Sequence, residues 1–214
     1  IVVAASLAYR PFRRYRIQRA RAAVAEQLRQ LPDGSPRRVE YEQRQQLFDL
    51  IQPVALKNCT FERFGETHDG GYLLCANLLG SARAGYSYGI SGYDKWGCDI
   101  STKLHVTVHQ YDCFDLEQPA CPAGEMVFHP ECIGPSAEKI DGRPFDTLAN
   151  QLARNGDRGK RFVMKIDVEG AEWESLLAAP DDTLRDIEQL QIEFHWVREG
   201  ERWVQDDRYL RLRS

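Results

Sequence analysis

Three carboxylates are crowded into one short segment of this chain. Asp167 follows an apolar stretch that starts at Phe162, and Glu169 and Glu172 come two and five residues later. Carboxylates placed this closely can favour a positively charged group or hold a divalent cation through their oxygens. The alternative is structural: Lys165, inside the apolar stretch, forms a buried ion pair with Asp167, and the two glutamates favour a helix N-terminus.

A histidine ends the last strongly apolar stretch, which runs from Leu190 to His195. If this stretch is a strand, Glu193 and His195 share one face of it, because successive side chains alternate. Histidine titrates near neutral pH and can take a proton from a hydroxyl or an amine. The structural alternative, a hydrogen-bonded histidine at the edge of the core, stays open.

The elements that must position these residues follow Pro53, where short apolar runs alternate with helical patterns. This alternation predicts βαβ units and an α/β fold with a mostly parallel sheet, which binds its ligand at the carboxyl ends of the strands. The first two predicted strands form a hairpin around a Gly-Gly turn. Strands are predicted at 60–64, 72–75, 85–90, 105–111, 126–129, 162–168 and 190–196, and helices at 95–103, 145–154 and 171–178.

The N-terminal part has a different character. Residues 1–31 carry a net charge of +6, whereas the whole chain carries −4. We expect residues 1–12 to be the remnant of a membrane anchor or signal segment, or else an ordinary helix start, because a short apolar stretch is flanked by arginines. Residues 13–53 are expected to form a basic helical extension, with helices over 13–31 and 39–51, and residues 54–214 to form the main domain.

Composition excludes several classes of protein. Of the 214 residues, 43% are hydrophobic and 28% are charged, which excludes wholesale disorder and a fibrous fold. The mildly acidic balance argues against a nucleic-acid partner. Six cysteines lie between positions 59 and 132 without zinc-site spacing. They are compatible with disulfides in an oxidising compartment or with buried thiols, and the anchor-like start slightly favours the secretory pathway over the cytoplasm.

The segment around the carboxylates also resembles a known signature. Lys165-Ile-Asp-Val-Glu-Gly-Ala-Glu172 is similar to the K-x-D-x-E-G-x-E motif of FkbM-type methyltransferases. Other segments resemble the related methyltransferase-like domain in the same order, over roughly residues 56–196. These segments are His68-Asp-Gly-Gly-Tyr72, Tyr86-Ser-Tyr-Gly-Ile90, Val108-His-Gln-Tyr-Asp112 and Phe128-His-Pro-Glu-Cys-Ile-Gly134.

This resemblance implies a Rossmann-like class I methyltransferase fold that binds S-adenosylmethionine. Gly89 would let the backbone approach the methionine part of the cofactor, with Ser91 as a weaker contact. Asp112, at the end of the next strand, would accept hydrogen bonds from the ribose diol, although a strand-end cap is the alternative. Asp167 and Glu169 would face the methyl-transfer region, and His195 would act as the base.

The sequence departs from that pattern in two places. The first loop has Gly89 and Gly92 but lacks further glycines, and it does not supply the G-x-G-x-x-G of a nicotinamide enzyme. Only 18 residues follow Trp196, so we expect the C-terminal part of the domain to be truncated.

The acceptor is expected to be a small-molecule or glycan-like hydroxyl or amine, with membrane contact possible through the N-terminus. No metal is established. Two alternatives remain: a catalytically inactive methyltransferase fold that serves as a binding module, and a membrane-tethered interaction protein.

Overall fold

The structure, a computed structural model, describes residue 26 and the ranges 30–50 and 54–195. Contacts divide the chain into a unit that ends at Val54 and a unit that contains the residues from Ala55 onward. The first unit contains α2 (Pro36–Leu50), which covers most of the helix predicted at 39–51. The helix predicted at 13–31 lies outside the described residues apart from its last part. None of the described helices is long and apolar enough to cross a membrane.

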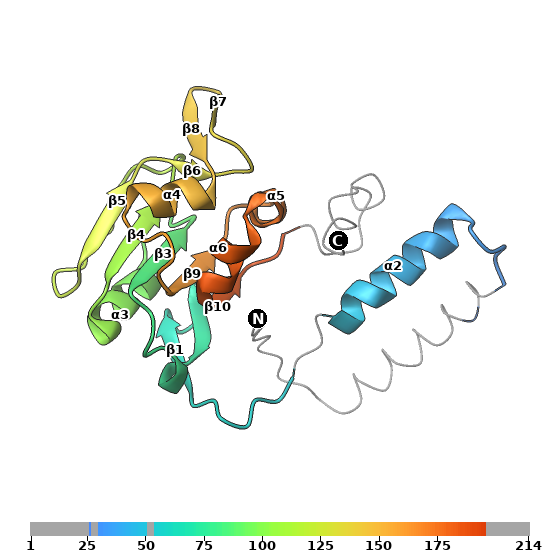
Figure 1. Cartoon of the computed structure of the whole chain (residues 1–214), viewed down its shortest axis with the longest axis horizontal. Helices are drawn as coiled ribbons and strands as arrows, with labels where there is room; N and C mark the ends of the chain where they lie inside the picture. Colours follow the sequence, from blue (N-terminus) through green and yellow to red (C-terminus); the bar gives the residue numbers. More distant parts are fainter. Residues whose placement is uncertain (1–25, 27–29, 51–53, 196–214) are drawn as a thin grey trace. The chain divides into compact units, whose positions relative to one another are not determined.

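The second unit is built on a five-stranded sheet in which every neighbouring pair is parallel (Figure 1). Its order is β10-β9-β3-β4-β5, so the chain moves outward from β3 in one direction and later returns to the centre at β9. This confirms the predicted parallel α/β sheet and is compatible with a Rossmann-like fold. The strands are β3 (Ala84–Tyr88), β4 (Thr107–Tyr111), β5 (Met126–His129), β9 (Phe162–Ile166) and β10 (Ile187–Ile192).

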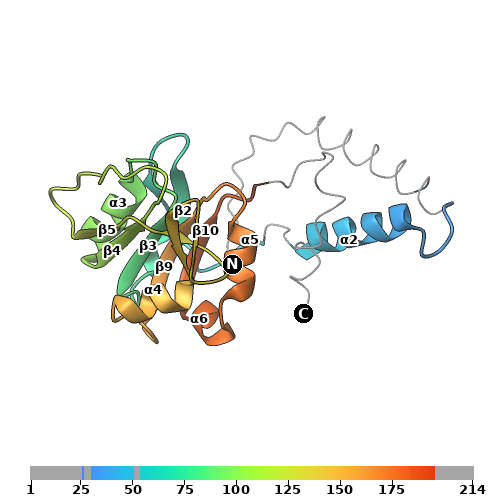
Figure 2. The same cartoon turned by 90° about the horizontal axis from the view of Figure 1, so that it is seen from above.

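Both faces of the sheet are covered, which explains why β3 and β9 are buried at every residue. On one face, Tyr86 and Met164 belong to a core that includes Leu148 of α4. On the other face, Val108 and Val163 pack with residues of α3 and of the β1–β2 hairpin. Figure 2 shows these layers, and the covering elements are β1 (Phe61–Gly65), β2 (Gly71–Cys75), η1 (Ala76–Leu78), α3 (Lys95–Leu104), α4 (Leu148–Arg154), α5 (Glu172–Ala178) and α6 (Asp181–Asp186).

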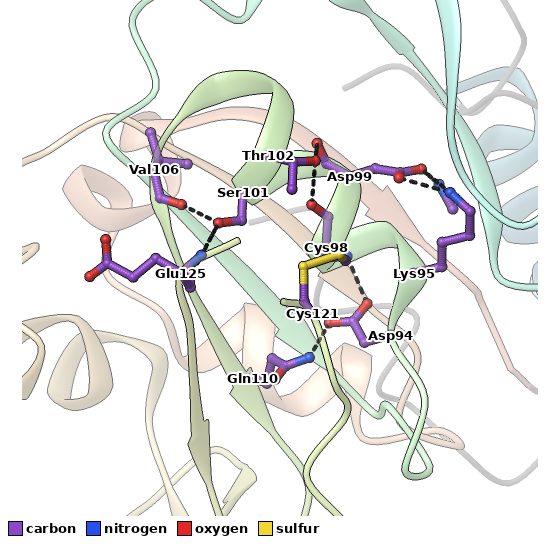
Figure 3. The surroundings of a disulfide bond; sticks show 12 residues. Asp94, Lys95, Cys98, Asp99, Ser101, Thr102, Val106, Gln110, Cys121 and Glu125 are labelled. Carbon is purple, nitrogen blue, oxygen red and sulfur yellow. Dashed lines mark hydrogen bonds and ion pairs between the residues drawn. A yellow bond between two sulfur atoms is a disulfide. The ribbon is translucent and has the colours of Figure 1, made fainter. Parts of the chain in front are cut away.

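Hydrogen bonds and a disulfide hold the N-terminal end of helix α3, as Figure 3 shows. Asp94 caps the helix, and its carboxylate accepts hydrogen bonds from the backbone N of Gly97 and from the side-chain amide of Gln110 on β4. The Cys98–Cys121 disulfide then ties the first turns of the helix to the segment that precedes β5.

All six cysteines are paired, as Cys59–Cys75, Cys98–Cys121 and Cys113–Cys132. The sequence left disulfides and buried thiols as alternatives, and the structure shows disulfides. They join the segment before β1 to β2, α3 to the segment before β5, and the end of β4 to β6 (Cys132–Ile133).

One predicted helix starts later than expected. The helix predicted at 145–154 begins only at Leu148, because Phe145 belongs to β8 (Arg143–Asp146). Thr147 caps the helix by accepting a hydrogen bond from the backbone N of Asn150. Strand β8 pairs with β6 and with β7 (Glu138–Ile140) in a small sheet that the sequence analysis did not predict, and α6 was also missed.

The other predicted strands are confirmed with shifted ends. The hairpin of β1 and β2 is antiparallel, and β5 covers 126–129 as predicted. The strand predicted at 190–196 is β10, which starts earlier, at Ile187, and ends at Ile192. Its predicted last residue, Trp196, lies outside the described residues.

Candidate functional site

Strands β3, β9 and β10, which surround the point where the strand order reverses, end at the same edge of the sheet. The backbone N of Asp167 donates to the carbonyl O of Tyr88, 3.2 Å away, and the N of Glu193 donates to the carbonyl O of Ile166 at 3.1 Å. The residues that directly follow β3, β9 and β10 therefore lie side by side at the carboxyl edge of the sheet. Ligands of open parallel sheets bind at this edge, at the point where the strand order reverses.

His195 lies among three carboxylates at this edge. Its Nε2 is 3.7 Å from Oδ1 of Asp167, 3.5 Å from Oε2 of Glu169 and 3.9 Å from Oε1 of Glu193. We call these four residues the acidic centre. The structure thus brings together Asp167, Glu169 and His195, the three residues predicted for catalysis. The side chain of Glu169 is 84% exposed, so the centre is open to solvent on that side.

A fourth carboxylate orients the imidazole from behind. Glu172, the first residue of α5, has no solvent exposure. Its Oε1 accepts hydrogen bonds from Nδ1 of His195 at 2.7 Å and from the backbone N of Val168 at 3.0 Å. A carboxylate that holds Nδ1 in this way fixes which ring nitrogen faces the site. Sequence reasoning placed Glu172 in the cluster but assigned it no such contact.

The electrostatics of the centre follow from these contacts. Burial by itself would lower the pKa of His195, but the hydrogen bond to Glu172 and the surrounding carboxylates outweigh it and raise that pKa above its ordinary value. Burial raises the pKa of Asp167, against the opposing charges of Lys165 and His195. Burial, followed by the charge of Asp167, also raises the pKa of Glu193. The site therefore concentrates negative charge that a cation or an imidazolium offsets.

The direct ion pair between Lys165 and Asp167, which the sequence offered as the structural alternative, does not form. Lys165 is buried, and its Nζ donates to the carbonyl O of Gly89 at 2.7 Å. Among the described residues, no carboxylate lies within 4.0 Å of this Nζ. Asp167 therefore forms no direct ion pair with Lys165, and the cationic group nearest its carboxylate in the described part of the chain is His195, at 3.7 Å.

Two loops at the carboxyl edge hold strained backbone. Ser91 has a φ of 47° and Glu169 a φ of 54°, in the left-handed region that non-glycine residues rarely adopt. Only two other non-glycine residues of the described chain have a positive φ, His105 and Asp141. Such strain clusters at functional sites, where it holds a side chain or a backbone group in place. Both Ser91 and Glu169 were predicted site residues.

Gly89 is required by the fold at this point. It has a φ of 72°, and a Cβ atom on it would lie 1.7 Å from the carbonyl O of Asp167. The close approach that requires a glycine here is made by the loop after β9, whereas the sequence analysis predicted an approach to a cofactor. A contact of Gly89 with a cofactor stays a prediction.

The carboxylate of Asp112 accepts hydrogen bonds from four backbone N–H groups. Its Oδ2 accepts hydrogen bonds from the N atoms of Ile90 and Ser91, and its Oδ1 accepts from the N atoms of Phe114 and Asp115, all at 2.8–3.1 Å. A carboxylate offers about four acceptor positions, so all of them are in use. This arrangement matches the strand-end cap that the sequence left as the alternative, and ribose binding would require some of these bonds to open.

Two features indicate which groups the carboxyl edge of the sheet could bind. The hydroxyl of Tyr72, on β2, is buried and has no hydrogen-bond partner among the described residues. Burial, and then the charges of Asp167 and Glu193, raise its pKa, which places this phenol within the field of the acidic centre. Ligand atoms of Asp167, Glu193 and His195 also lie within 4.8 Å of one another, a spacing that would admit a metal ion.

Comparisons with protein-family models, with curated proteins and with solved structures find no match to this chain. The similarity to FkbM-type methyltransferases accordingly rests on the sequence segments given above.

Proposed function

We propose that the domain is an S-adenosylmethionine-dependent methyltransferase that acts on a hydroxyl or amine of a small-molecule or glycan-like acceptor. The observation that carries the proposal is the position of His195. Its imidazole, held by buried Glu172, faces Asp167 and Glu169 at the carboxyl edge where the strand order reverses. A base and a negative field at this edge suit transfer of a methyl group from a cation to a neutral acceptor.

The residues of the edge fit the methionine end of such a cofactor better than its ribose. The acidic centre would favour the positive sulfonium, and the hydroxyl of Tyr72 is a buried donor that a bound polar group would satisfy. Asp112 would hold the loop after β3 in shape through its bonds to Ile90 and Ser91.

The chain's contribution to the reaction would be mainly positioning. The bound cofactor would supply an electrophilic methyl group, which would form a bond to the acceptor atom while its bond to sulfur breaks and leaves the electron pair on sulfur. In its neutral form, His195 would take at Nε2 the proton that the acceptor loses, and the carboxylates that raise its pKa would stabilise the resulting imidazolium. Alignment of donor and acceptor supplies most of the rate in reactions of this kind.

A binding module with an inactive methyltransferase fold is the second candidate function. It is favoured by the four backbone N–H groups that already donate to Asp112, the residue predicted to bind the ribose.

An assay with radiolabelled S-adenosylmethionine and a panel of hydroxyl and amine acceptors distinguishes the enzyme from the binding module. We expect methyl transfer that falls about 10²–10⁴-fold in His195→Gln, as for loss of a general base. The matched control is His68→Gln, at an exposed position. Cofactor binding without turnover on any acceptor would support the module, and neither binding nor turnover would reject both.

A further inference from the structure

A sequence pattern outside the acidic centre points to a covalent modification. Asn58-Cys59-Thr60 follows the Asn-x-Ser/Thr pattern of N-glycosylation acceptors, in which x is any residue except proline. The chain has three other asparagines, and none of them has a serine or threonine two positions later; they are Asn77, Asn150 and Asn155.

The three residues lie on the surface directly before β1. The side chains of Asn58 and Thr60 are exposed, and the hydrogen bonds at both residues are made by backbone atoms. Asn77 holds this backbone from η1: its Nδ2 donates to the carbonyl O of Asn58, and its Oδ1 accepts from the N of Thr60, each at 2.7 Å. The acceptor amide is thus presented to solvent on a fixed backbone.

The disulfides supply the second, independent observation. All six cysteines are paired, and one pair includes Cys59, the middle residue of the pattern. Disulfides form and persist in oxidising compartments such as the lumen of the endoplasmic reticulum and the cell exterior. N-glycosylation acceptors are used in proteins of the same compartments.

We propose that Asn58 carries an N-linked glycan. The sugar donor is a lipid-linked oligosaccharide pyrophosphate. The bond from its first sugar carbon to the pyrophosphate oxygen breaks, and that carbon bonds to Nδ2 of Asn58. The amide loses one proton, and the lipid pyrophosphate departs as the leaving group.

The fold sets the order of events. Once the Cys59–Cys75 bond closes, the backbone of the pattern is tied to the end of β2 and to Asn77, and Ala76 N donates to the carbonyl O of Thr60. Before closure the segment lacks these contacts and can adopt the conformation that a transferase binds, so we expect glycan transfer to precede closure. Delayed closure in Cys75→Ser therefore raises the fraction of chains that carry the glycan.

The test is expression of the full chain through the secretory pathway of a eukaryotic host. Peptide N-glycosidase treatment in ¹⁸O-water then labels each formerly glycosylated asparagine as aspartate for mass spectrometry. We expect label at Asn58 in the oxidised chain, complete loss of the glycan in Asn58→Gln and Thr60→Ala, and retention in Thr60→Ser and in the control Asn155→Gln. Folding of Asn58→Gln is checked by its three disulfides. An unlabelled Asn58 in correctly disulfide-bonded chains, or a glycan that survives Thr60→Ala, would overturn the proposal.

Discussion

Nδ1 of His195 lies 2.7 Å from Oε1 of Glu172, a side chain with no exposure to solvent. This contact joins the end of the sheet to the first turn of α5 and turns Nε2 of the imidazole toward Asp167, Glu169 and Glu193. A buried carboxylate behind an imidazole is a supporting contact that fixes ring orientation. The acidic centre therefore depends on a residue that does not itself reach the surface.

Replacing Glu172 should lower both the stability of the domain and its methyl-transfer activity. Glu172→Ala leaves the N–H of Val168 without its acceptor and frees the ring of His195. A buried donor left unsatisfied costs about 1–3 kcal/mol, and a protein of this size loses about 2–4 °C in Tm for each kcal/mol. Thermal unfolding and methyl transfer are measured beside the exposed control Glu117→Ala. A native Tm with full turnover would contradict the supporting role.

Asp167 and Glu169 should behave as site residues and not as stabilising residues. Lys165 donates to the carbonyl O of Gly89 and forms no direct ion pair with Asp167, so Asp167→Asn breaks no such pair. Burial raises the pKa of Asp167, which means that the folded state disfavours its charge, and a neutral isostere should leave the Tm unchanged or raise it.

We therefore expect Asp167→Asn and Glu169→Gln to fold and to lose at least about tenfold in methyl transfer, equal to about 1.4 kcal/mol of transition-state stabilisation. A large fall in Tm with full activity per folded molecule would make Asp167 structural instead.

Asp112, in contrast, should behave as a stabilising residue. Asp112→Asn retains one acceptor oxygen and turns an NH₂ group toward two of the four backbone N–H groups that the carboxylate now satisfies. Each buried donor left without an acceptor costs about 1–3 kcal/mol. The Tm should fall well below that of Asp141→Asn, a substitution at an exposed turn. Unchanged stability with a loss of cofactor affinity alone would restore the ribose-binding role predicted from the sequence.

The contrast between Asp167 and Asp112 shows what the sequence could predict. Alternating apolar runs and helical patterns located the parallel strands, and residues directly after those strands had to share one edge of the sheet. The grouping of Asp167 and Glu169 follows from that rule. His195 was predicted inside a strand, but β10 ends at Ile192, and His195 reaches the same edge from the segment that follows it. The partners of Asp112 could not be predicted, because its four donors come from the irregular backbone of two loops, whose path no periodic pattern encodes.

The small sheet of β6, β7 and β8 was missed for a related reason. Its strands are two to four residues long, too short for alternation to be recognised. Phe145 was assigned to the following helix, whereas in the structure it pairs with Cys132 in a strand.

The disulfide pairing is directly testable. Peptide mapping without reduction should find Cys59 with Cys75, Cys98 with Cys121, and Cys113 with Cys132. Replacing Cys98 and Cys121 together by alanine should cost about 2–4 kcal/mol, since the cross-link limits the unfolded chain. Any other pairing, or six free thiols in protein from its native compartment, would contradict the structure.

Protonation in mild acid should destabilise the domain through a histidine pair beside Tyr86 in the sheet core. Nδ1 of His109 lies 3.0 Å from Nε2 of His129, and Nε2 of His109 lies 3.3 Å from Oδ2 of Asp157. Burial, followed by the charges of His109 and Arg154, lowers the pKa of His129 from 6.5 to about 4. Burial also lowers the pKa of His109, although Asp157 opposes it.

At this histidine pair, the unfolded chain binds more protons than the folded chain between about pH 6.5 and 4. The pair's contribution to stability is present above pH 6.5 and is lost as the pH falls toward 4, which lowers the Tm across this window. The raised pKa values of His195, Asp167 and Glu193 act in the opposite direction. His129→Gln should flatten the decline, whereas the exposed control His68→Gln should not. A Tm of His129→Gln that falls as steeply as that of the parent would contradict this assignment.

The proposed binding of S-adenosylmethionine at the carboxyl edge of the sheet is tested most directly by a crystal structure with S-adenosylhomocysteine. We predict that the ligand lies against the ends of β3 and β9, with its sulfur toward His195 and Asp167 and a polar group bonded to the hydroxyl of Tyr72. Disulfide-intact crystals that exclude the ligand at saturating concentration, or that hold it away from this edge, would contradict the account.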